Sequence, residues 1–233
     1  MIQIEQTEIV GWEAAIRGMR NPMNSWDNSD SYPAVDCGKC GKIEREGICR
    51  KEDRDCTGFY CYDIGFNDMA LMQKLAKAGT DHRKFMRMIV VYCDITAPLY
   101  WWKEFDTYKV GTVANSCSTM HRIHSKALTL DDFSHDLMRI SCVEYLQEII
   151  GVLNSIRLCY IATNDKSYWD SMIQLLPSSY NQKRTVMMNY EVLANIYNAR
   201  KNHKLDEWRE LCKWIEALPY SCLMTGKDGE PDG

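Results

Sequence analysis

The chain passes from Met88-Ile-Val-Val-Tyr-Cys-Asp-Ile95 directly into Thr96-Ala-Pro-Leu-Tyr-Trp-Trp-Lys-Glu-Phe105. The first segment is rich in β-branched residues, which predicts a strand. The second predicts a helix that starts at Thr96, has Pro98 in its first turn and runs to about residue 108. Consecutive residues cannot share a helix face, so we expect one of the two tryptophans in the core and the other at an interface.

Helices dominate the rest of the prediction. A strand over 2–10 and a short helix over 12–19 precede a loop over 21–33. Apolar residues recur at helical spacing in several later segments. Further helices are therefore predicted over 67–79, 137–160, 169–176, 189–199 and 205–218. This pattern predicts an α+β fold with a small sheet and several helices.

The composition is that of one soluble domain. The chain has 233 residues, of which 45% are hydrophobic and 26% charged, with a formal net charge of −4. We expect a single domain over 1–225 and a disordered tail over 226–233. No apolar run approaches the roughly 18 residues of a membrane span, and the first residues do not resemble a signal peptide. A cytoplasmic protein without a membrane partner is expected.

Cysteines cluster in a charged segment, 33–62, that we interpret as an inserted loop. Four of the eleven cysteines are the candidate ligands of one Zn²⁺ ion, and they are Cys37, Cys40, Cys49 and Cys56. Thiolates at this spacing suit a tetrahedral structural zinc site. An iron–sulfur cluster or free thiols are the alternatives, and Cys61 competes with Cys56 as fourth ligand. The remaining cysteines predicted to be core residues are Cys93, Cys142, Cys159 and Cys212.

Two stretches of the chain resemble the flavin-dependent thymidylate synthases (ThyX). The first is Ile95 to Thr119, where a strand runs into Ala-Pro, an aromatic helix and the position of the family signature R-H-R-x7-S. The second comprises Leu176-Pro177, Asn189-Tyr-Glu-Val-Leu-Ala-Asn195, Ala199-Arg200 and Asp206-Glu-Trp-Arg209. Order and spacing agree in both stretches, so the resemblance covers roughly residues 85–218.

The resemblance implies a fold, an assembly and an activity. The ThyX subunit is a compact α+β domain, here expected with a small antiparallel sheet and several helices, that assembles as a homotetramer with FAD and dUMP at subunit boundaries. The family's reaction is the reductive methylation of dUMP. NADPH reduces the flavin, methylenetetrahydrofolate supplies the carbon, and the reduced flavin delivers a hydride.

The signature itself is altered in this chain. Thr107-Tyr108-Lys109 stands where the family has Arg-His-Arg, and lysine cannot form the bidentate contacts of a guanidinium group. Cys117 replaces the nucleotide-contacting serine, and Glu191 replaces an arginine. By contrast, three residues that match the family directly are Asn189, Asn195 and Arg200.

The resemblance and the chemistry of the side chains together give the candidate site. Candidates for the flavin are Tyr108, Asn189 and Asn195, and candidates for the nucleotide are Thr112, Ser118 and Arg200. Candidate catalytic residues are Cys117, Arg200 and Lys109. Cys117 is either a nucleophile toward C6 of the pyrimidine or a small packing residue, and Arg200 is either a ligand of the nucleotide or a cation that complements a helix end.

These residues support two readings of the function and disfavour a third. The first is a ThyX-like synthase acting on dUMP or a related pyrimidine nucleotide with FAD, NADPH and folate. The alternative is a catalytically altered or inactive ThyX-like scaffold that binds a nucleotide or a protein partner. A nucleic-acid-binding zinc protein ranks last, because acidic residues are interleaved with the basic ones around the cysteine cluster.

Overall fold

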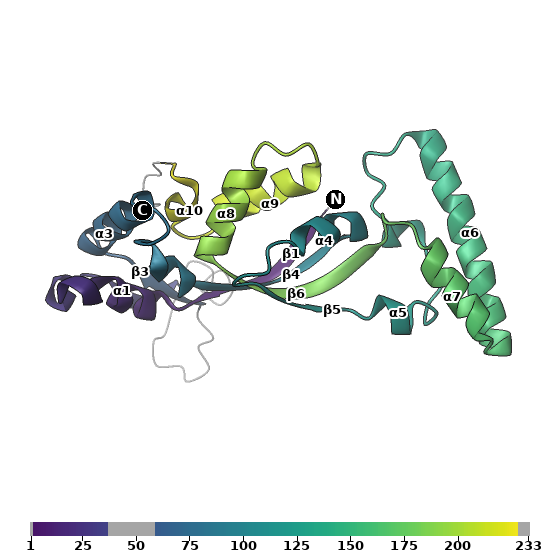
Figure 1. Cartoon of the computed structure of the whole chain (residues 1–233), viewed down its shortest axis with the longest axis horizontal. Helices are drawn as coiled ribbons and strands as arrows, with labels where there is room; N and C mark the ends of the chain where they lie inside the picture. The colour runs from purple at the N-terminus through teal and green to yellow at the C-terminus, as the bar shows by residue number, and fades with distance from the viewer. Residues whose placement is uncertain (1, 37–58, 228–233) are drawn as a thin grey trace, which may run out of the picture.

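The computed structural model describes residues 2–36 and 59–227, and a four-stranded antiparallel sheet lies at its centre (Figure 1). The strands lie in the order β1 (Gln3–Val10), β4 (Val90–Pro98), β6 (Asn181–Asn189) and β5 (Val113–Ser116). The register pairs Tyr92 of β4 with Met187 of β6, and Met187 with Val113 of β5. The predicted α+β class and small antiparallel sheet are confirmed.

One face of the sheet is covered and the other is open. In β4 the side chains of Val91, Cys93 and Ile95 are buried, whereas that of Tyr92 is 39% exposed. This alternation follows from the two-residue repeat of a strand. Figure 1 shows the helices α4 (Leu99–Phe105), α8 (Tyr190–Arg200) and α9 (Asp206–Glu216) on the covered side.

The main core contains a cluster of aromatic rings between the sheet and α9. Trp101 lies 4.9 Å from Trp102 and 4.8 Å from Trp208, measured between ring centroids. Both residues of the Trp101–Trp102 pair are buried, so the expectation that one lies at an interface is wrong. The short helix α4 is enclosed on both sides: Trp101 packs toward α9, and Trp102 donates a hydrogen bond of 2.9 Å to the carbonyl of Gln182 in β6.

Helices at the two ends of the sheet extend the molecule (Figure 1). At one end lie α1 (Trp12–Arg20), α3 (Phe66–Lys77) and α10 (Cys222–Thr225); at the other lie α5 (Thr119–Arg122), α6 (Ile140–Thr163) and α7 (Lys166–Leu175). Short 3-10 helices occupy Asn21–Met23, Trp26–Asn28, Lys84–Arg87 and Leu130–Asp132.

The α6–α7 end has its own small core, formed by Leu128, Phe133, Leu146, Ile150 and Leu153. Contrary to expectation, Cys142 and Cys159 are exposed, because they lie on α6 outside this core. Cys93 and Cys212 are buried as predicted. Among the described residues, no helix has both the length and the apolar character needed to span a membrane.

Two elements differ from the sequence prediction for identifiable reasons. The helix predicted from Thr96 begins at Leu99, because Pro98 keeps an extended backbone (ψ 152°) and belongs to β4. The strand β6 was not predicted, because its first half, Asn181-Gln-Lys-Arg-Thr185, lacks alternating apolar residues. Hydrogen bonding to β4 on one edge and to β5 on the other stabilises this segment as a strand despite its polar sequence.

A buried ion pair fixes the loop that precedes the cysteine-rich segment. Arg20 Nε lies 2.6 Å from Asp68 Oδ1, and the two side chains are 5% and 0% exposed. Asp68 Oδ2 accepts hydrogen bonds from the hydroxyls of Ser29 (2.7 Å) and Ser31 (2.6 Å). Burial would raise the pKa of Asp68, but the hydrogen bonds from both serines and from Arg20, with the charge of Arg20, lower it below its usual value.

The ends of the segment 33–62 are paired with each other. β2 (Tyr32–Asp36) and β3 (Phe59–Asp63) form an antiparallel ladder in which Asp36 is opposite Phe59. The proposed zinc ligands Cys37, Cys40, Cys49 and Cys56 lie outside the described residues, as does 228–233 of the predicted tail. Gly226 and Lys227 of that tail are described, and Lys227 pairs with Glu216 at 2.7 Å.

Candidate functional site

The loop at the altered signature docks onto the start of α8. Gly111 has φ of 77°, and a Cβ there would lie 2.9 Å from Asn189 Nδ2 and 3.2 Å from Val192 Cγ2. Asn189 Oδ1 accepts a hydrogen bond of 3.0 Å from the amide of Val192, so this asparagine caps α8. The hydroxyl of the neighbouring Thr112 is buried and has no hydrogen-bond partner among the described residues.

Arg200, the last residue of α8, is held by three side chains. Its Nε donates a hydrogen bond of 2.8 Å to Tyr108 Oη, and its Nη1 lies 2.5 Å from Glu104 Oε1. Its guanidinium group also stacks over the Trp208 ring, 4.6 Å from the centroid. The same Glu104 accepts a hydrogen bond of 2.7 Å from Trp208 Nε1.

The charges in this Arg200 cluster (Glu104, Tyr108, Arg200, His203 and Trp208) compensate each other. Burial would raise the pKa of Glu104, but the hydrogen bonds from Trp208 and Arg200, with the charges of Arg200 and His203, lower it. Burial would lower the pKa of Arg200, yet its contacts with Tyr108 and Glu104 raise it. Glu104 is therefore an anion at neutral pH, and it already neutralises the guanidinium group that the sequence assigns to the nucleotide.

A second ion pair lies at the first turn of α8. Arg83 Nε lies 2.8 Å from Glu191 Oε2, and Arg83 Nη2 donates a hydrogen bond of 3.1 Å to Asn195 Oδ1. Glu191 is buried, with 6% of its surface exposed. The acidic residue that replaces an arginine of the ThyX pattern thus has a basic partner of its own, and the oxygen of Asn195 is occupied by that partner.

The other candidate residues lie on the surface around the edge strand β5. Lys109, Cys117 and Ser118 are exposed, and Lys109 makes no ion pair or hydrogen bond with any residue that the structure describes. Ser118 Oγ accepts a hydrogen bond of 3.2 Å from the amide of His121 and so caps the short helix α5. The backbone amide of Cys117 donates to the carbonyl of Lys183 at 2.9 Å.

The structure brings some candidates together and separates others. Tyr108 contacts Arg200, and the Gly111–Thr112 turn contacts Asn189. Thr112 and Cys117 flank the two ends of β5, and five residues of strand span about 17 Å. Within one chain, Cys117 and Thr112 therefore do not reach the same small ring.

Glu104 and Arg83 are site residues that sequence reasoning missed. Glu104 lies four residues before Tyr108, a spacing that in a helix places two side chains on one face, and that spacing is the one available signal, although α4 ends at Phe105. Nothing local marks Arg83, since its partner Glu191 is 108 residues away.

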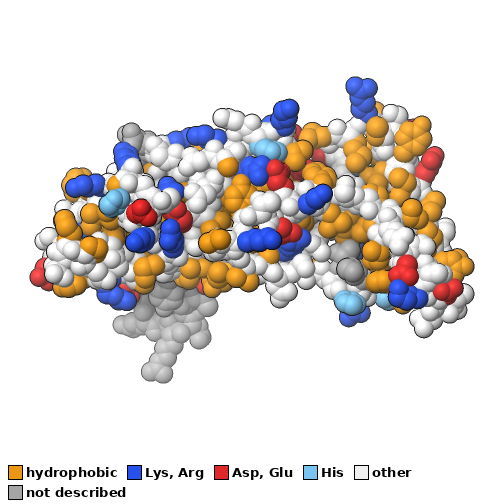
Figure 2. Space-filling view, in the orientation of Figure 1, with side chains coloured by type: hydrophobic (Ala, Val, Ile, Leu, Met, Phe, Trp, Pro, Cys, Tyr) orange, Lys and Arg blue, Asp and Glu red, His pale blue; other side chains and the backbone are white. Residues whose placement is uncertain are grey.

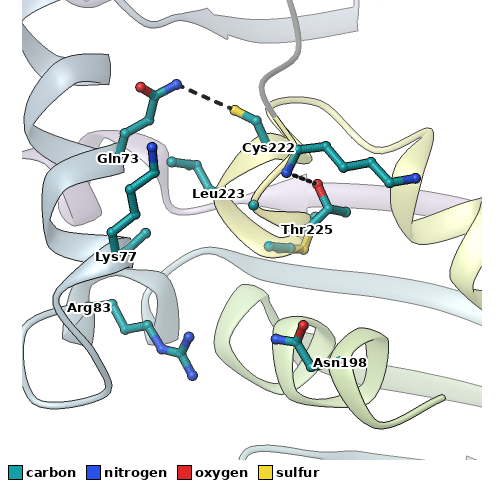
Figure 3. A pocket seen from close by; sticks show the side chains of 11 residues that line it. Gln73, Lys77, Arg83, Asn198, Cys222, Leu223 and Thr225 are labelled. Carbon is teal, nitrogen blue, oxygen red and sulfur yellow. Dashed lines mark hydrogen bonds between the residues drawn. The ribbon is translucent and has the colours of Figure 1, made fainter. Parts of the chain in front are cut away.

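A separate pocket lies between α3, α8 and α10 (Figure 3). Gln73, Arg83, Asn198 and Cys222 contribute to its lining, and Gln73 Nε2 lies 4.0 Å from Cys222 Sγ. None of the predicted site residues that the structure describes lines it. Arg83 connects the pocket wall to Asn195 but is already engaged by Glu191.

Within residues 2–36 and 59–227, no group of three or more histidine, cysteine or acidic side chains is arranged to hold a metal ion. The zinc site proposed for the cysteine-rich segment lies outside these residues and stays a prediction.

Comparison with known proteins identifies the fold. Two crystal structures of the flavin-dependent thymidylate synthase ThyX from Helicobacter pylori, both with FAD and dUMP, match nearly the whole chain. The first has 15% identity and a TM-score of 0.68, covering 97% of this chain and 98% of the other. The second has 15% identity and a TM-score of 0.67, covering 98% of each. No protein-family model and no curated protein sequence matches this chain. At this identity the likeness shows the fold, so the chain has the ThyX fold.

Proposed function

We propose that this protein is a divergent flavin-dependent thymidylate synthase that binds FAD and dUMP, or a related pyrimidine nucleotide. The observation that carries the proposal is the agreement in fold, over 97% of the chain, with a ThyX that holds FAD and dUMP. In the proposed reaction, dUMP, methylenetetrahydrofolate, NADPH and one proton give thymidylate, tetrahydrofolate and NADP⁺. The flavin, when bound, supplies hydride transfer.

Three observations on the chain support a nucleotide near the altered signature. Thr112 presents a buried hydroxyl that has no hydrogen-bond partner among the described residues, and such a group gains from a ligand that accepts its hydrogen bond. Lys109, three residues away, is an exposed cation with no described partner, and it is suited to a phosphate. Gly111 between them lets the turn approach Asn189 closely, which holds the backbone of this turn against the start of α8.

The Arg200 cluster acts in this proposal through Tyr108. The guanidinium group orients the phenol with a hydrogen bond of 2.8 Å, and Glu104 holds the guanidinium group in turn. Arg200 is therefore a positioning residue for an aromatic wall beside the flavin, and Lys109 takes over the charge that the family places on its signature arginines.

Completion of the site requires a second subunit in this proposal. Because β5 separates Thr112 from Cys117 by about 17 Å, Cys117 and Ser118 of one chain serve the nucleotide of another. This arrangement agrees with the homotetramer that the resemblance implies. Cys117, as a thiolate, would add to C6 of the pyrimidine and open the C5=C6 double bond, so that C5 attacks the one-carbon unit. Loss of the C5 proton would then restore the double bond and expel the thiolate.

The decisive experiment is flavin retention followed by nucleotide titration. The protein is incubated with FAD, desalted, and its absorbance recorded before and after addition of dUMP. We expect retained flavin bands that shift with dUMP, and release of tritium from C5-labelled dUMP when NADPH and methylenetetrahydrofolate are present. A protein that keeps no flavin and does not respond to dUMP contradicts the proposal.

A pair of lysine variants tests the assignment of the phosphate. Lys109→Ala should weaken dUMP binding about tenfold to a hundredfold, because a charged hydrogen bond contributes about 1.5–3 kcal/mol. Lys103→Ala, an exposed lysine on α4, is the matched control and should leave the affinity unchanged. Equal dUMP affinities for the two variants would show that Lys109 does not bind the phosphate.

The second candidate function is a nucleotide-binding scaffold without turnover. Two ion pairs, Arg200–Glu104 and Arg83–Glu191, favour this function. They neutralise charged side chains at positions where the ThyX pattern has arginines that bind ligands. This reading predicts nucleotide binding with no tritium release. Tritium release at any dUMP concentration excludes it.

A further inference from the structure

Arg184, in the first half of β6, contacts the start of the altered signature. Basic and acidic side chains lie next to one another over the central part of the molecule (Figure 2). In the ion pair at this end of β6, Arg184 Nη1 lies 2.7 Å from Oδ1 of Asp106, the residue directly before Thr107-Tyr108-Lys109. The segment 106–117 contains no arginine of its own, and Arg184 is not one of the motif residues that carry the ThyX resemblance. The resemblance therefore assigns Arg184 no role.

The guanidinium group of Arg184 contacts an aromatic ring and two acceptors at once. Its Cζ lies 4.2 Å from the centroid of the Trp102 ring, which is buried. Besides its contact with Asp106, it donates a hydrogen bond of 2.9 Å from Nε to Gln182 Oε1. A planar guanidinium group has its donors in a fixed fork and stacks on aromatic rings, whereas a lysine ammonium is a point charge. Lysine at position 184 would therefore keep the charge but not all three contacts.

Gln182 connects Arg184 to Cys117. The Nε2 of Gln182 donates a hydrogen bond of 3.2 Å to the carbonyl oxygen of Cys117. The last ladder pair of β5 is Ser116 with Arg184, so Cys117 lies just beyond the ladder. The amide of Cys117 still donates to the carbonyl of Lys183 at 2.9 Å. Both backbone groups of Cys117 are therefore bonded to β6, one of them through a side chain.

These contacts attach both ends of one segment to β6. Asp106 lies at the start of the segment 106–117 and Cys117 at its end. The two β6 side chains that hold them are two positions apart, so they lie on the same face of the strand. The candidate nucleotide ligands Lys109 and Thr112 lie between the two ends. Fixing the ends of a loop removes conformations that its middle could otherwise adopt, so less conformational entropy is lost when a ligand binds.

We propose that Arg184 is a positioning residue for the candidate site. Through Asp106 and Gln182 it holds the two ends of the segment 106–117, so that the side chains on this segment are ordered before a nucleotide binds. The Arg184 bridge (Asp106, Gln182 and Arg184) needs no ligand, whereas its effect on turnover rests on the proposed function.

Hydrogen–deuterium exchange of single amides tests the Arg184 bridge without a ligand. Arg184→Lys keeps the charge but cannot serve both acceptors, so exchange should become about tenfold faster at the amides of Thr107 and Cys117. Gln182→Glu keeps an acceptor for Arg184 but removes the N–H donor to Cys117, so exchange should become faster at Cys117 alone. Arg17→Lys, the same substitution in an exposed ion pair, is the matched control and should leave both rates unchanged.

Each of three results would overturn the proposal. Unchanged exchange at both amides in Arg184→Lys would mean that Arg184 holds neither end of the segment. Faster exchange along the whole of β6 would mean that Arg184 stabilises the sheet rather than the segment. Faster exchange at both amides in Gln182→Glu, or at neither, would mean that the two ends are not held separately.

Tritium release from C5-labelled dUMP then separates positioning from packing. Gln182→Glu should lower kcat about tenfold and leave KM for dUMP near the wild-type value, because Lys109 and Thr112 keep their places. Arg184→Lys should lower kcat and raise KM together. A wild-type kcat in Gln182→Glu, despite faster exchange at Cys117, overturns the effect on turnover. If the wild type itself releases no tritium, the proposed function fails, and the exchange pattern still decides whether the bridge exists.

Discussion

The buried carboxylate of Asp68 offers the sharpest test of the energetics. Asp68→Asn keeps the shape of the side chain but removes the charge opposite Arg20, which is 5% exposed. The amide also turns two N–H groups toward a site where Ser29, Ser31 and the backbone all donate. Breaking one partner of a buried pair costs about 3–5 kcal/mol, so the free energy of unfolding should fall by that amount.

Urea unfolding followed by circular dichroism measures this loss. The matched control is Glu13→Gln, whose partner Arg17 lies 3.8 Å away with side chains 75% and 65% exposed. Such an exposed pair contributes about 0–1 kcal/mol, so the control should unfold with the wild type. A loss below about 1 kcal/mol for Asp68→Asn would refute the view that this network holds the loop.

The same network predicts a dependence on pH. Because the pKa of Asp68 is lowered in the folded state, its contribution is fully present above the ordinary aspartate pKa of about 3.9. The contribution is lost as pH falls through the lower, folded-state pKa. The stability gap between the wild type and Asp68→Asn should therefore be constant near neutral pH and shrink in acid.

Three further predictions concern the site and the thiols. Gly111→Ala should cost about 1–3 kcal/mol in urea unfolding, because φ of 77° and the 2.9 Å approach to Asn189 leave no room for a Cβ. Iodoacetamide at pH 8 should alkylate the exposed Cys117 quickly and Cys93 slowly, because burial raises the pKa of Cys93 to about 12. Mass spectrometry of the digested protein measures the two rates, and equal rates would contradict this expectation. Metal analysis should find stoichiometric zinc bound by the segment 33–62, and its absence with intact thiols would remove the zinc site.

Elements governed by local sequence were predictable. The strand before Pro98 and the long helix over 137–160 follow from β-branched content and from a helical repeat of apolar residues. Both are present as β4 and α6, with ends displaced by two to three residues. The ThyX resemblance, read from the order of short motifs, predicted the fold that the whole-chain comparison then identified.

Features that depend on distant partners were not predictable. β6 becomes a strand because β4 and β5 pair with its two edges, although half of it is polar. Arg200 matched a family residue at the expected position, but its neutralisation by Glu104, 96 residues earlier, is visible only in the folded chain. Local sequence indicates which secondary structure a residue favours, whereas the site depends on contacts between residues that are far apart in the chain.

The β2–β3 ladder has a consequence for how this chain can vary. The pairing of Asp36 with Phe59 joins the two ends of the 22-residue stretch 37–58 in an antiparallel stem. Halving the length of a flexible loop lowers the entropic free-energy cost of closing it by only about 0.6 kcal/mol. Lengthening or shortening this stretch should therefore change the free energy of unfolding little. The β2–β3 pairing therefore holds the two ends of the stretch together whatever its length, while the sheet and the Arg200 cluster stay as they are.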